Sequence, residues 1–352
     1  MKRNILKLSL YVVATFFLSG CMKDNEWINR HRIEDNLSKG VFIVNEGNFM
    51  YGNASLSFYD PVNRKVQNDL FYNVNGLPLG DVGQSMIING NEGYIVLNNS
   101  GKIYVIDTST GKYVGKITGL TSPRYVHFVN DEKAYVTDLY AGKITIFNPK
   151  TNLVIDSILT RRHPSTEQMV QIGDIVFATC WSYDNTILVI DTKKDSIVGE
   201  ISTGKQPGGI VTDNQNKIWV LCDGGWGKPG ILGTPVLQRI DPVTQNIELT
   251  LNLSADGKPA RLAINGSRDT LLFINNGIWR MAVSSDKLPA LPFVSSKGYL
   301  LYGLGIDPNS SEIYFSDAID YSQNGIVYRY SGMGARIDSF KTGIIPGAFC
   351  FK

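Results

Sequence analysis

Aromatic and carboxamide residues follow several short apolar segments of the chain, and these residue types suit ligand binding better than covalent chemistry. The aromatic members are Phe49, Tyr51, Tyr140, Trp181, Tyr183, Trp226 and Tyr321. The polar members, near the ends of the apolar segments, are Asn98, Asp138, Asp223, Asn276 and Asp317. Rings provide contact area at a small entropic cost, while amides and carboxylates fix the orientation of a bound molecule. The set predicts a site for a large, mostly uncharged ligand with flat surfaces and amide edges.

Two arginines occupy equivalent places beside these residues, Arg124 after a proline and Arg261 after an alanine. They could line the same site, or they could pair with Asp138 or Glu167, and the sequence leaves both arrangements open. Each aromatic residue could also pack its own loop against a neighbouring repeat. We expect the aromatic set as a whole to form an exposed binding rim.

Residues that could perform catalysis or hold a metal are scarce. The three histidines, His31, His127 and His163, show no ligand spacing, so no histidine-rich metal site is expected. We expect His127 to pack within a strand. Residues 224–230 superficially resemble a phosphate loop, but the lysine is not followed by Ser or Thr. The sequence therefore predicts a binding protein, without a catalytic centre, a metal or a cofactor.

The elements that position these residues recur as a short strand that ends before a turn. The seven copies end at Asp60, Asp107, Asn148, Asp191, Asp241, Ala282 and Ser331. The copies are 41 to 50 residues apart, which is the size of one four-stranded propeller blade. The repeat predicts an all-β fold, a seven-bladed β-propeller over residues 40–352. The Asp and Asn side chains are expected to accept hydrogen bonds from the turn backbone.

The two ends of this domain complement each other. Residues 346–351 repeat the pattern of an innermost strand but no hairpin follows, whereas the first blade, from Val41, has no such strand before it. A ring left open here would expose an unpaired sheet edge. We expect the C-terminal strand to complete the N-terminal blade. The loops that carry the aromatic residues then emerge together on one face.

The first residues predict export. A basic start precedes an apolar stretch at 5–18 that is too short for a comfortable membrane span. The following Ser19, Gly20 and Cys21 complete a run similar to the lipobox of bacterial lipoproteins, in which the cysteine is lipidated. Residues 1–20 are then a lipoprotein signal peptide and residues 21–39 a lipidated tether. An ordinary cleaved signal with a coincidental cysteine is the alternative.

Charge and cysteine content restrict the partners. The formal net charge is only +2, which gives no electrostatic footprint for nucleic acid. Beyond the anchor, the chain contains Cys180, Cys222 and Cys350, so at most one internal disulfide can form. Cys180 and Cys222 occupy the same slot in consecutive repeats. This spacing leaves open whether they are bridged.

Several of these features together resemble a known group of proteins. The lipobox, the polar tether with its Met22-Lys23-Asp24-Asn25-Glu26 start, the opening VFIVNEGN and blades of the form IYVIDTSTGKYVGKI are similar to the YncE-like propeller surface lipoproteins of Bacteroidota. Within that group the chain most resembles the BtuG-type cobalamin-binding proteins. These motifs are specific to the fold rather than to the ligand.

The resemblance implies a surface lipoprotein that binds cobalamin or a related corrinoid and delivers it to a TonB-dependent outer-membrane transporter. It implies an outer-membrane location facing the cell exterior, with membrane contact through the lipid anchor only. A ferric siderophore is an alternative ligand, for which Arg124, Arg261 and Lys228 would matter more than the carboxylates. A structural or adhesive protein that binds protein or glycan is a further alternative.

Overall fold

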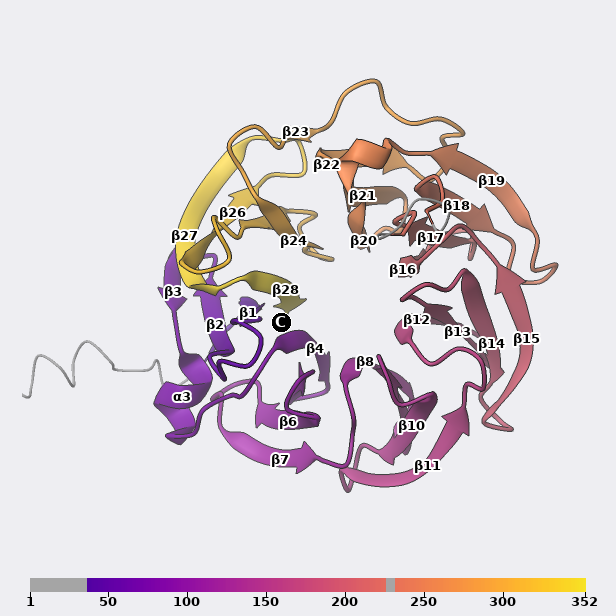
Figure 1. Ribbon diagram of the computed structural model, residues 1–352. Helices are drawn as coiled ribbons and strands as arrows, with labels where there is room; N and C mark the ends of the chain where they lie inside the picture. The colour runs from indigo at the N-terminus through magenta and orange to yellow at the C-terminus, as the bar shows by residue number, and fades with distance from the viewer. Residues whose placement is uncertain (1–36, 226–231) are drawn as a thin grey trace, which may run out of the picture. The chain divides into compact units, whose positions relative to one another are not determined.

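The computed structural model describes residues 37–225 and 232–352. Strands β1 to β28 within these residues form seven four-stranded sheets, which are arranged in a ring with one edge of each sheet toward a common centre (Figure 1). The prediction of an all-β, seven-bladed propeller is confirmed. The predicted signal peptide, Cys21 and most of the tether lie outside the described residues, as do Trp226 and Lys228. Within the described part of the chain, no helix has the length and apolar character needed to cross a membrane.

Each blade runs from an innermost strand near the centre of the ring to an outermost strand at its edge. In that order, blades 1 to 3 are β28 (Pro346–Phe351), β1 (Val41–Asn45), β2 (Ser55–Asp60) and β3 (Lys65–Gln67); β4 (Gly83–Asn89), β5 (Glu92–Leu97), β6 (Lys102–Asp107) and β7 (Tyr113–Ile117); and β8 (Pro123–Asn130), β9 (Lys133–Asp138), β10 (Lys143–Asn148) and β11 (Leu153–Leu159). Blades 4 and 5 are β12 (Thr166–Ile172), β13 (Ile175–Cys180), β14 (Thr186–Asp191) and β15 (Ser196–Ser202); and β16 (Pro207–Thr212), β17 (Ile218–Cys222), β18 (Val236–Ile240) and β19 (Ile247–Asn252). Blades 6 and 7 are β20 (Ala260–Ile264), β21 (Thr270–Ile274), β22 (Gly277–Ala282) and β23 (Val294–Ser295); and β24 (Leu301–Ile306), β25 (Ile313–Asp317), β26 (Asn324–Tyr330) and β27 (Arg336–Ile344). Two short helices interrupt this pattern, α3 (Leu70–Asn75) and the 3-10 turn η1 (Ala255–Gly257).

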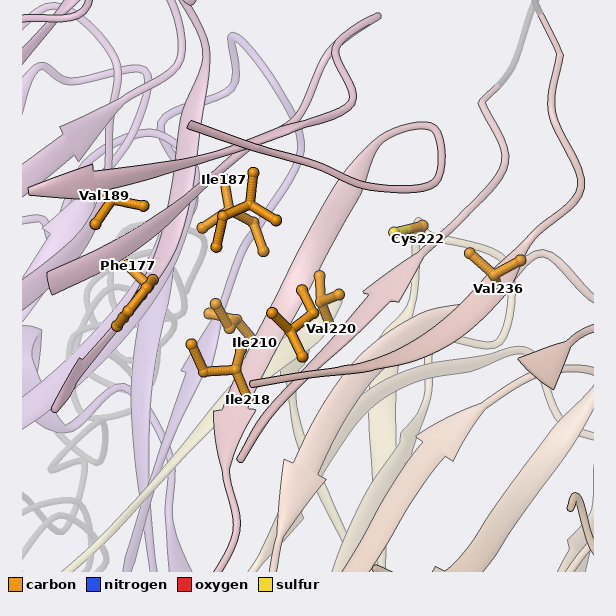
Figure 2. Packing of buried hydrophobic residues seen from close by; sticks show 10 residues of the cluster. Phe177, Ile187, Val189, Ile210, Ile218, Val220, Cys222 and Val236 are labelled. Carbon is orange, nitrogen blue, oxygen red and sulfur yellow. The ribbon is translucent and has the colours of Figure 1, made fainter. Parts of the chain in front are cut away.

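The core lies between neighbouring blades rather than inside one sheet. The second and third strands of each blade are covered on both faces, so their sequences are nearly continuous apolar runs; all five residues of β17 are buried. Figure 2 shows the packing between blades 4 and 5, where Phe177 and Val189 of one blade are clustered with Ile210 and Val220 of the next. Burying such a side chain contributes about 1.5–3 kcal/mol. The flat blades are therefore held together by six such clusters within the described residues.

The ring closes through its own last strand, as predicted. β28 pairs with β1 in antiparallel register, with Val41 opposite Phe351 and Ile43 opposite Phe349. The backbone N–H of Lys352 also donates to the carbonyl of Gly40 at 2.9 Å. The C-terminal strand thus becomes the innermost strand of blade 1, so the blade has four strands and the inner edge of β1 is paired.

The residues that end the third strands form turns, which confirms their structural interpretation. Asp107 Oδ1 accepts from the backbone N–H groups of Ser109 at 3.0 Å and Thr110 at 2.9 Å. Asp60, Asp191 and Asp241 accept from the residues two and three positions later in the same way. The prediction for His127 also fits its surroundings, because its Nε2 lies 2.8 Å from Gln171 Oε1 and burial lowers its pKa.

The three cysteines that the structure describes are not bridged. Cys180, Cys222 and Cys350 are all buried free thiols. Cys180 packs between blades 3 and 4, whereas Cys222 packs between blades 4 and 5, beside Val236 (Figure 2). The equivalent slot in consecutive blades therefore places the two sulfurs in different interfaces, and the Cys180–Cys222 disulfide that the spacing left open does not form.

Candidate binding site at the channel mouth

The start of every innermost strand carries an irregularity that builds the candidate site. In all seven blades, the pairing between the innermost strand and the second strand shifts register there. A shift of this kind is a β-bulge, which leaves a residue unpaired and re-aims its side chain. The first unpaired residues are Gln84, Arg124, Glu167, Gly208, Arg261, Tyr302 and Gly347. We call these seven residues the mouth ring.

One side of the mouth ring is tied together by Arg124. Its Nη1 donates to Gln84 Oε1 and its Nε donates to Glu167 Oε1, both at 2.6 Å. The Arg124 and Glu167 side chains are 16% and 5% exposed, so the ion pair lies in a region of reduced dielectric where both groups need partners. A single guanidinium therefore links blades 2, 3 and 4 at the mouth.

The other side of the ring is organised around Glu46, which follows β1. Arg261 Nη2 lies 3.3 Å from Glu46 Oε1, and the Tyr302 hydroxyl donates to Glu46 Oε2 at 2.7 Å. A Cβ atom on Gly347 would lie 2.4 Å from Glu46 Oε1. Glu46 thus fills the place that a side chain at Gly347 would take. Arg261 also has a left-handed φ of 52°, a strained conformation that clusters at functional sites.

The charges of the mouth ring are nearly balanced. Burial raises the pKa of Glu46, while Arg261 and the Tyr302 hydroxyl oppose the shift. Burial likewise raises the pKa of Glu167, and Arg124 opposes it. The two arginines therefore line the mouth and pair with carboxylates at the same time. The partner of Arg124 is Glu167, not Asp138.

A cavity of about 750 Å³ opens at the ring. Its walls combine rings, amides and charged groups from blades 3 to 7. The aromatic, amide and charged side chains that line it are Arg124, Tyr125, Glu167, Gln168, Trp181, Gln206, Asp223, Asp256, Lys258, Arg261, Asn276, Tyr299, Tyr302 and Tyr321. The Trp181 indole N–H donates to Asp223 Oδ2 at 3.0 Å, and Tyr302 and Tyr321 meet edge to face with centroids 5.8 Å apart.

The mouth ring has one vacant position, at Gly208. A Cβ atom there would have only Trp181 Cδ1 within 4 Å, at 3.8 Å. The ring is closed on either side of this point by the side chains of Glu167 and Arg261. The vacancy therefore widens the cavity beside the Cδ1 edge of the Trp181 indole, and the Arg124 guanidinium carbon lies over the ring, 5.9 Å from its centroid.

Six of the fourteen residues that the sequence singled out for the site line this cavity. They are Arg124, Trp181, Asp223, Arg261, Asn276 and Tyr321. Asp223 is held by Trp181 and by the backbone N–H of Gly225 at 2.7 Å, and burial raises its pKa. Asn276 Oδ1 accepts from Ser296 Oγ at 2.9 Å.

Three predicted binding residues at second-strand ends instead hold the backbone. Asn98 Nδ2 donates to Ser122 Oγ at 2.8 Å. Asp138 accepts from the N–H groups of Ser122 and Tyr140 at 2.8 and 3.0 Å. Asp317 accepts from Leu300 N–H at 2.9 Å. All three are buried, and none lines the cavity. They fasten the loops between blades, a structural task that their positions at strand ends allow.

The remaining predicted residues surround the cavity without lining it. Tyr51, Tyr140 and Tyr183 are 79%, 70% and 53% exposed, and Phe49 is 64% exposed. These rings lie in loops on the same face of the ring as the mouth, because they follow the second strands of blades 1, 3 and 4. Trp226, also predicted to bind, lies outside the described residues.

Sequence reasoning missed several residues of the mouth ring. Gln84, Glu167 and Tyr302 were not singled out as binding residues, and neither was Glu46. The usable signal was positional: all three ring residues occupy the place in their innermost strand that Arg124 occupies in blade 3. Glu46 follows the last residue of its second strand, the position that Trp181 and Asp223 occupy in blades 4 and 5, so an alignment of the repeats would have found it.

A family model described as "Domain of unknown function (DUF5074)" matches residues 39–339. The chain belongs to the DUF5074 family. The match covers nearly the whole propeller, from just before β1 into β27. None of the curated proteins compared with this DUF5074 chain matches it.

Solved structures resemble this DUF5074 propeller at low sequence identity. A quinonprotein alcohol dehydrogenase-like protein from Bacteroides thetaiotaomicron has a TM-score of 0.68 at 16% identity, covering 90% of this chain and 79% of that one. A protein from Lactobacillus plantarum has a TM-score of 0.66 at 12% identity, covering 90% and 100%. The periplasmic gluconolactonase of Pseudomonas aeruginosa has a TM-score of 0.66 at 12% identity, covering 89% and 99%. These likenesses show the fold alone.

Proposed function

We propose that this DUF5074 protein is a binding module without chemistry of its own, which captures cobalamin or a related corrinoid at the mouth ring. The observation that carries the proposal is the cavity of about 750 Å³, lined by aromatic rings, amides and mutually compensated charges. A corrinoid is a large, flat macrocycle with many amide side chains. Rings and amides at the mouth suit such a surface, part of which would rest across the opening.

The Trp181 ring and the neighbouring vacancy at Gly208 support the flat-ligand part of the proposal. Gln206 supports the amide part: it lines the cavity, is 1% exposed, and both polar atoms of its side chain lack a hydrogen-bond partner within the described residues. A buried amide without a partner is costly. A ligand amide that enters the cavity would satisfy it.

The charge balance of the mouth disfavours an anionic ligand such as a ferric siderophore. Arg124, Lys258 and Arg261 line the cavity, and so do Glu167, Asp223 and Asp256. Each arginine is already paired with a carboxylate. An anion would have to displace a buried carboxylate from its arginine, which is unfavourable.

The proposal includes the location that the N-terminal sequence predicts. Lipidation at Cys21 would anchor the protein to the outer membrane facing the cell exterior, and a TonB-dependent transporter would receive the captured ligand. The exposed aromatic residues around the mouth, Phe49, Tyr51 and Tyr140, offer a surface for that second protein. They also suit the adhesive alternative, in which the rim binds a protein or glycan directly.

Calorimetric titration of the purified protein with cyanocobalamin tests the proposal. We expect saturable binding and a rise in the thermal midpoint at micromolar ligand. No heat and no thermal shift would overturn the corrinoid proposal, and binding of a ferric catecholate instead would favour the siderophore alternative.

Variants at Trp181 then locate the site. Trp181→Ala should weaken cyanocobalamin binding by about 1–3 kcal/mol, because a ring that stacks on the ligand is lost. Trp181→Phe keeps a ring but removes the hydrogen bond to Asp223, so it should weaken binding less. Tyr72→Ala, which removes a 59% exposed ring from α3, is the matched control and should leave affinity unchanged. If both Trp181 variants bound cyanocobalamin as tightly as Tyr72→Ala, the ligand would bind elsewhere on the protein.

A further inference from the structure

One histidine, one cysteine and one aspartate meet away from the mouth ring, at the junction of blades 3 and 4. His163 lies in the loop between β11 and β12, Cys180 is the last residue of β13, and Asp184 lies in the loop that follows β13. One ring nitrogen of His163, Sγ of Cys180 and a carboxylate oxygen of Asp184 all lie within 4.8 Å of one another. His163 and Cys180 are 5% and 0% exposed.

Short local turns hold these three side chains in place. The backbone N–H of Asp184 donates to the carbonyl of Trp181 at 2.8 Å, which folds the loop so that Cys180 and Asp184 share one side. His163 Nδ1 lies 2.7 Å from Asp184 Oδ2, and His163 Nε2 lies 3.5 Å from Glu200 Oε1. Three potential donor groups thus converge from two loops and from the end of β13, and Glu200 of the outer strand β15 lies at the other ring nitrogen of His163.

Thiolate, imidazole and carboxylate are the ligands that zinc takes in proteins. Zinc bonds are about 2.0–2.3 Å long, so tetrahedral ligand atoms are separated by roughly 3.3–3.6 Å. The observed spread is close enough for side-chain rotation to reach this geometry. The carboxylates of Asp184 and Glu200 both lie beside His163 and favour a cation there. Arg162 is the neighbouring cation: its Nε donates to His163 Nε2 at 3.3 Å, and its 75% exposed side chain also pairs with Glu200, so Arg162 contacts the ring nitrogen opposite the one that faces Asp184.

The same residues do not suit nucleophilic catalysis. The Cys180 thiol is inaccessible to a substrate, since the residue is fully buried among Ala178, Leu188 and other apolar side chains. Burial, followed by the charges of Asp184 and Glu200, raises its pKa well above the ordinary value. An activated cysteine requires the opposite environment.

We propose that His163, Cys180 and Asp184 bind a single Zn²⁺ ion, with the fourth position open to water. Binding replaces the thiol proton of Cys180, which leaves for solvent, with a zinc–sulfur bond. The ion fastens the loop between β11 and β12 to the loop after β13. Because Trp181 follows Cys180 directly, zinc also fixes the segment that carries this cavity residue. The zinc proposal does not depend on which ligand the mouth ring binds.

Metal analysis of the purified protein, stripped by a chelator and then titrated with Zn²⁺, tests the site. We expect one equivalent of zinc to bind and to raise the thermal midpoint. Cys180→Ser should weaken zinc binding by at least about a hundredfold, because a direct ligand is lost. Cys222→Ser is the matched control: it changes a buried free cysteine in the same slot of the next blade, and it should bind zinc as the unchanged protein does.

Cobalt provides a signature that a structural role alone would not produce. Co²⁺ at the site should give thiolate-to-cobalt charge-transfer absorption, present in Cys222→Ser and absent in Cys180→Ser. Asp184→Asn keeps the shape of the side chain and serves if Cys180→Ser does not fold; it should weaken zinc binding in the same direction. Failure to bind zinc, or binding that neither Cys180→Ser nor Asp184→Asn weakens, would overturn the proposal.

Discussion

The two ends of each blade follow different rules. At the turn between the third and outer strands, Asp60, Asp107, Asp191 and Asp241 accept the same pair of backbone hydrogen bonds. At the start of the innermost strand every blade has the same bulge, yet the seven mouth-ring residues include Gln, Arg, Glu, Gly and Tyr. Four of the seven turns thus repeat both the Asp residue and its contacts, whereas the seven innermost strands repeat only the backbone bulge.

This difference separates what the fold requires from what it permits. A turn needs its N–H groups satisfied, and a short acceptor at one position does this in any blade. A bulge needs no particular side chain, and it points that side chain into the space shared by all blades. The varied ring is therefore where a ligand can be selected without altering the propeller, provided that buried charges remain paired.

The largest expected effect comes from breaking that pairing. Arg124→Met leaves Glu167 buried without its partner and should lower the free energy of unfolding by about 3–5 kcal/mol. Adding Glu167→Met removes the orphaned charge, so the double variant should regain most of the loss. Urea unfolding of both variants measures the difference. If the double variant remained as unstable as the single one, the ring would be required by the fold and the comparison would fail.

The sequence predicted the features of the fold that recur in several blades. The third strands and their Asp turns recur along the sequence, and the pattern of an innermost strand recurs once more at residues 346–351. The structure confirms these strands, the Asp turns and the closure of blade 1 by the C-terminal strand. Of the seven mouth-ring residues, only Arg124 and Arg261 were predicted, as two cations at equivalent starts of innermost strands. Glu167 and Tyr302 occupy the same place but share no residue type with them, so they were missed. Glu46 contacts the ring because the closure of blade 1 places Gly347 beside it.

The His163, Cys180 and Asp184 cluster was missed for a similar reason. Their spacing along the chain matches no metal-binding motif, since His163 and Cys180 come from different elements, the loop before β12 and the end of β13. Only blade packing brings them together. The same limit explains why Asn98, Asp138 and Asp317 were wrongly predicted to line the site. The sequence shows that they lie at strand ends on the binding face, but it does not show which groups they hydrogen-bond.

A turn substitution should have an intermediate effect. Asp107→Ala removes the acceptor of four hydrogen bonds and should lower the free energy of unfolding by about 1 kcal/mol. Ligand affinity should not change, because the turn lies at the far end of the blade from the mouth. Asp156→Ala, on the exposed strand β11, is the control and should cost less, since the Asp156 carboxylate accepts from the backbone N–H of the adjacent Ser157 in contact with solvent.

The effect of Asp107 should also depend on pH. Hydrogen bonds from Ser109 and Thr110 hold the pKa of Asp107 below its ordinary value of 3.8. A lowered carboxyl pKa stabilises the fold above the unfolded-state pKa, and this contribution is lost as the pH falls through the folded-state value. The difference between the unchanged protein and Asp107→Ala should therefore be full at neutral pH and shrink below about pH 4. A difference that grew in acid would contradict the turn assignment.

The smallest effect on stability is expected at the vacant ring position, and it sharpens the comparison most. Gly208 has an ordinary φ and open space beside it, so Gly208→Ala should change the free energy of unfolding by less than about 0.5 kcal/mol. The adjacent Gly209 differs: its added Cβ would lie 2.7 Å from Leu262 Cβ, and Gly209→Ala should cost about 1–3 kcal/mol. Thermal and urea unfolding of Gly208→Ala and Gly209→Ala distinguish a glycine with open space beside it from one that close packing requires.

Ligand binding should reverse the order of these two positions. Gly208→Leu would fill the vacancy beside Trp181 and should weaken cyanocobalamin binding at least tenfold while the ring stays folded. Gly209→Ala should destabilise the propeller, and at a temperature where it remains folded it should weaken binding less than Gly208→Leu does, because its added Cβ would meet Leu262 of the next blade although Gly209 also lines the cavity. If Gly208→Leu bound as tightly as the unchanged protein, the vacancy would not be the entry for the flat group. The bulge at blade 5 would then be a feature of the backbone alone.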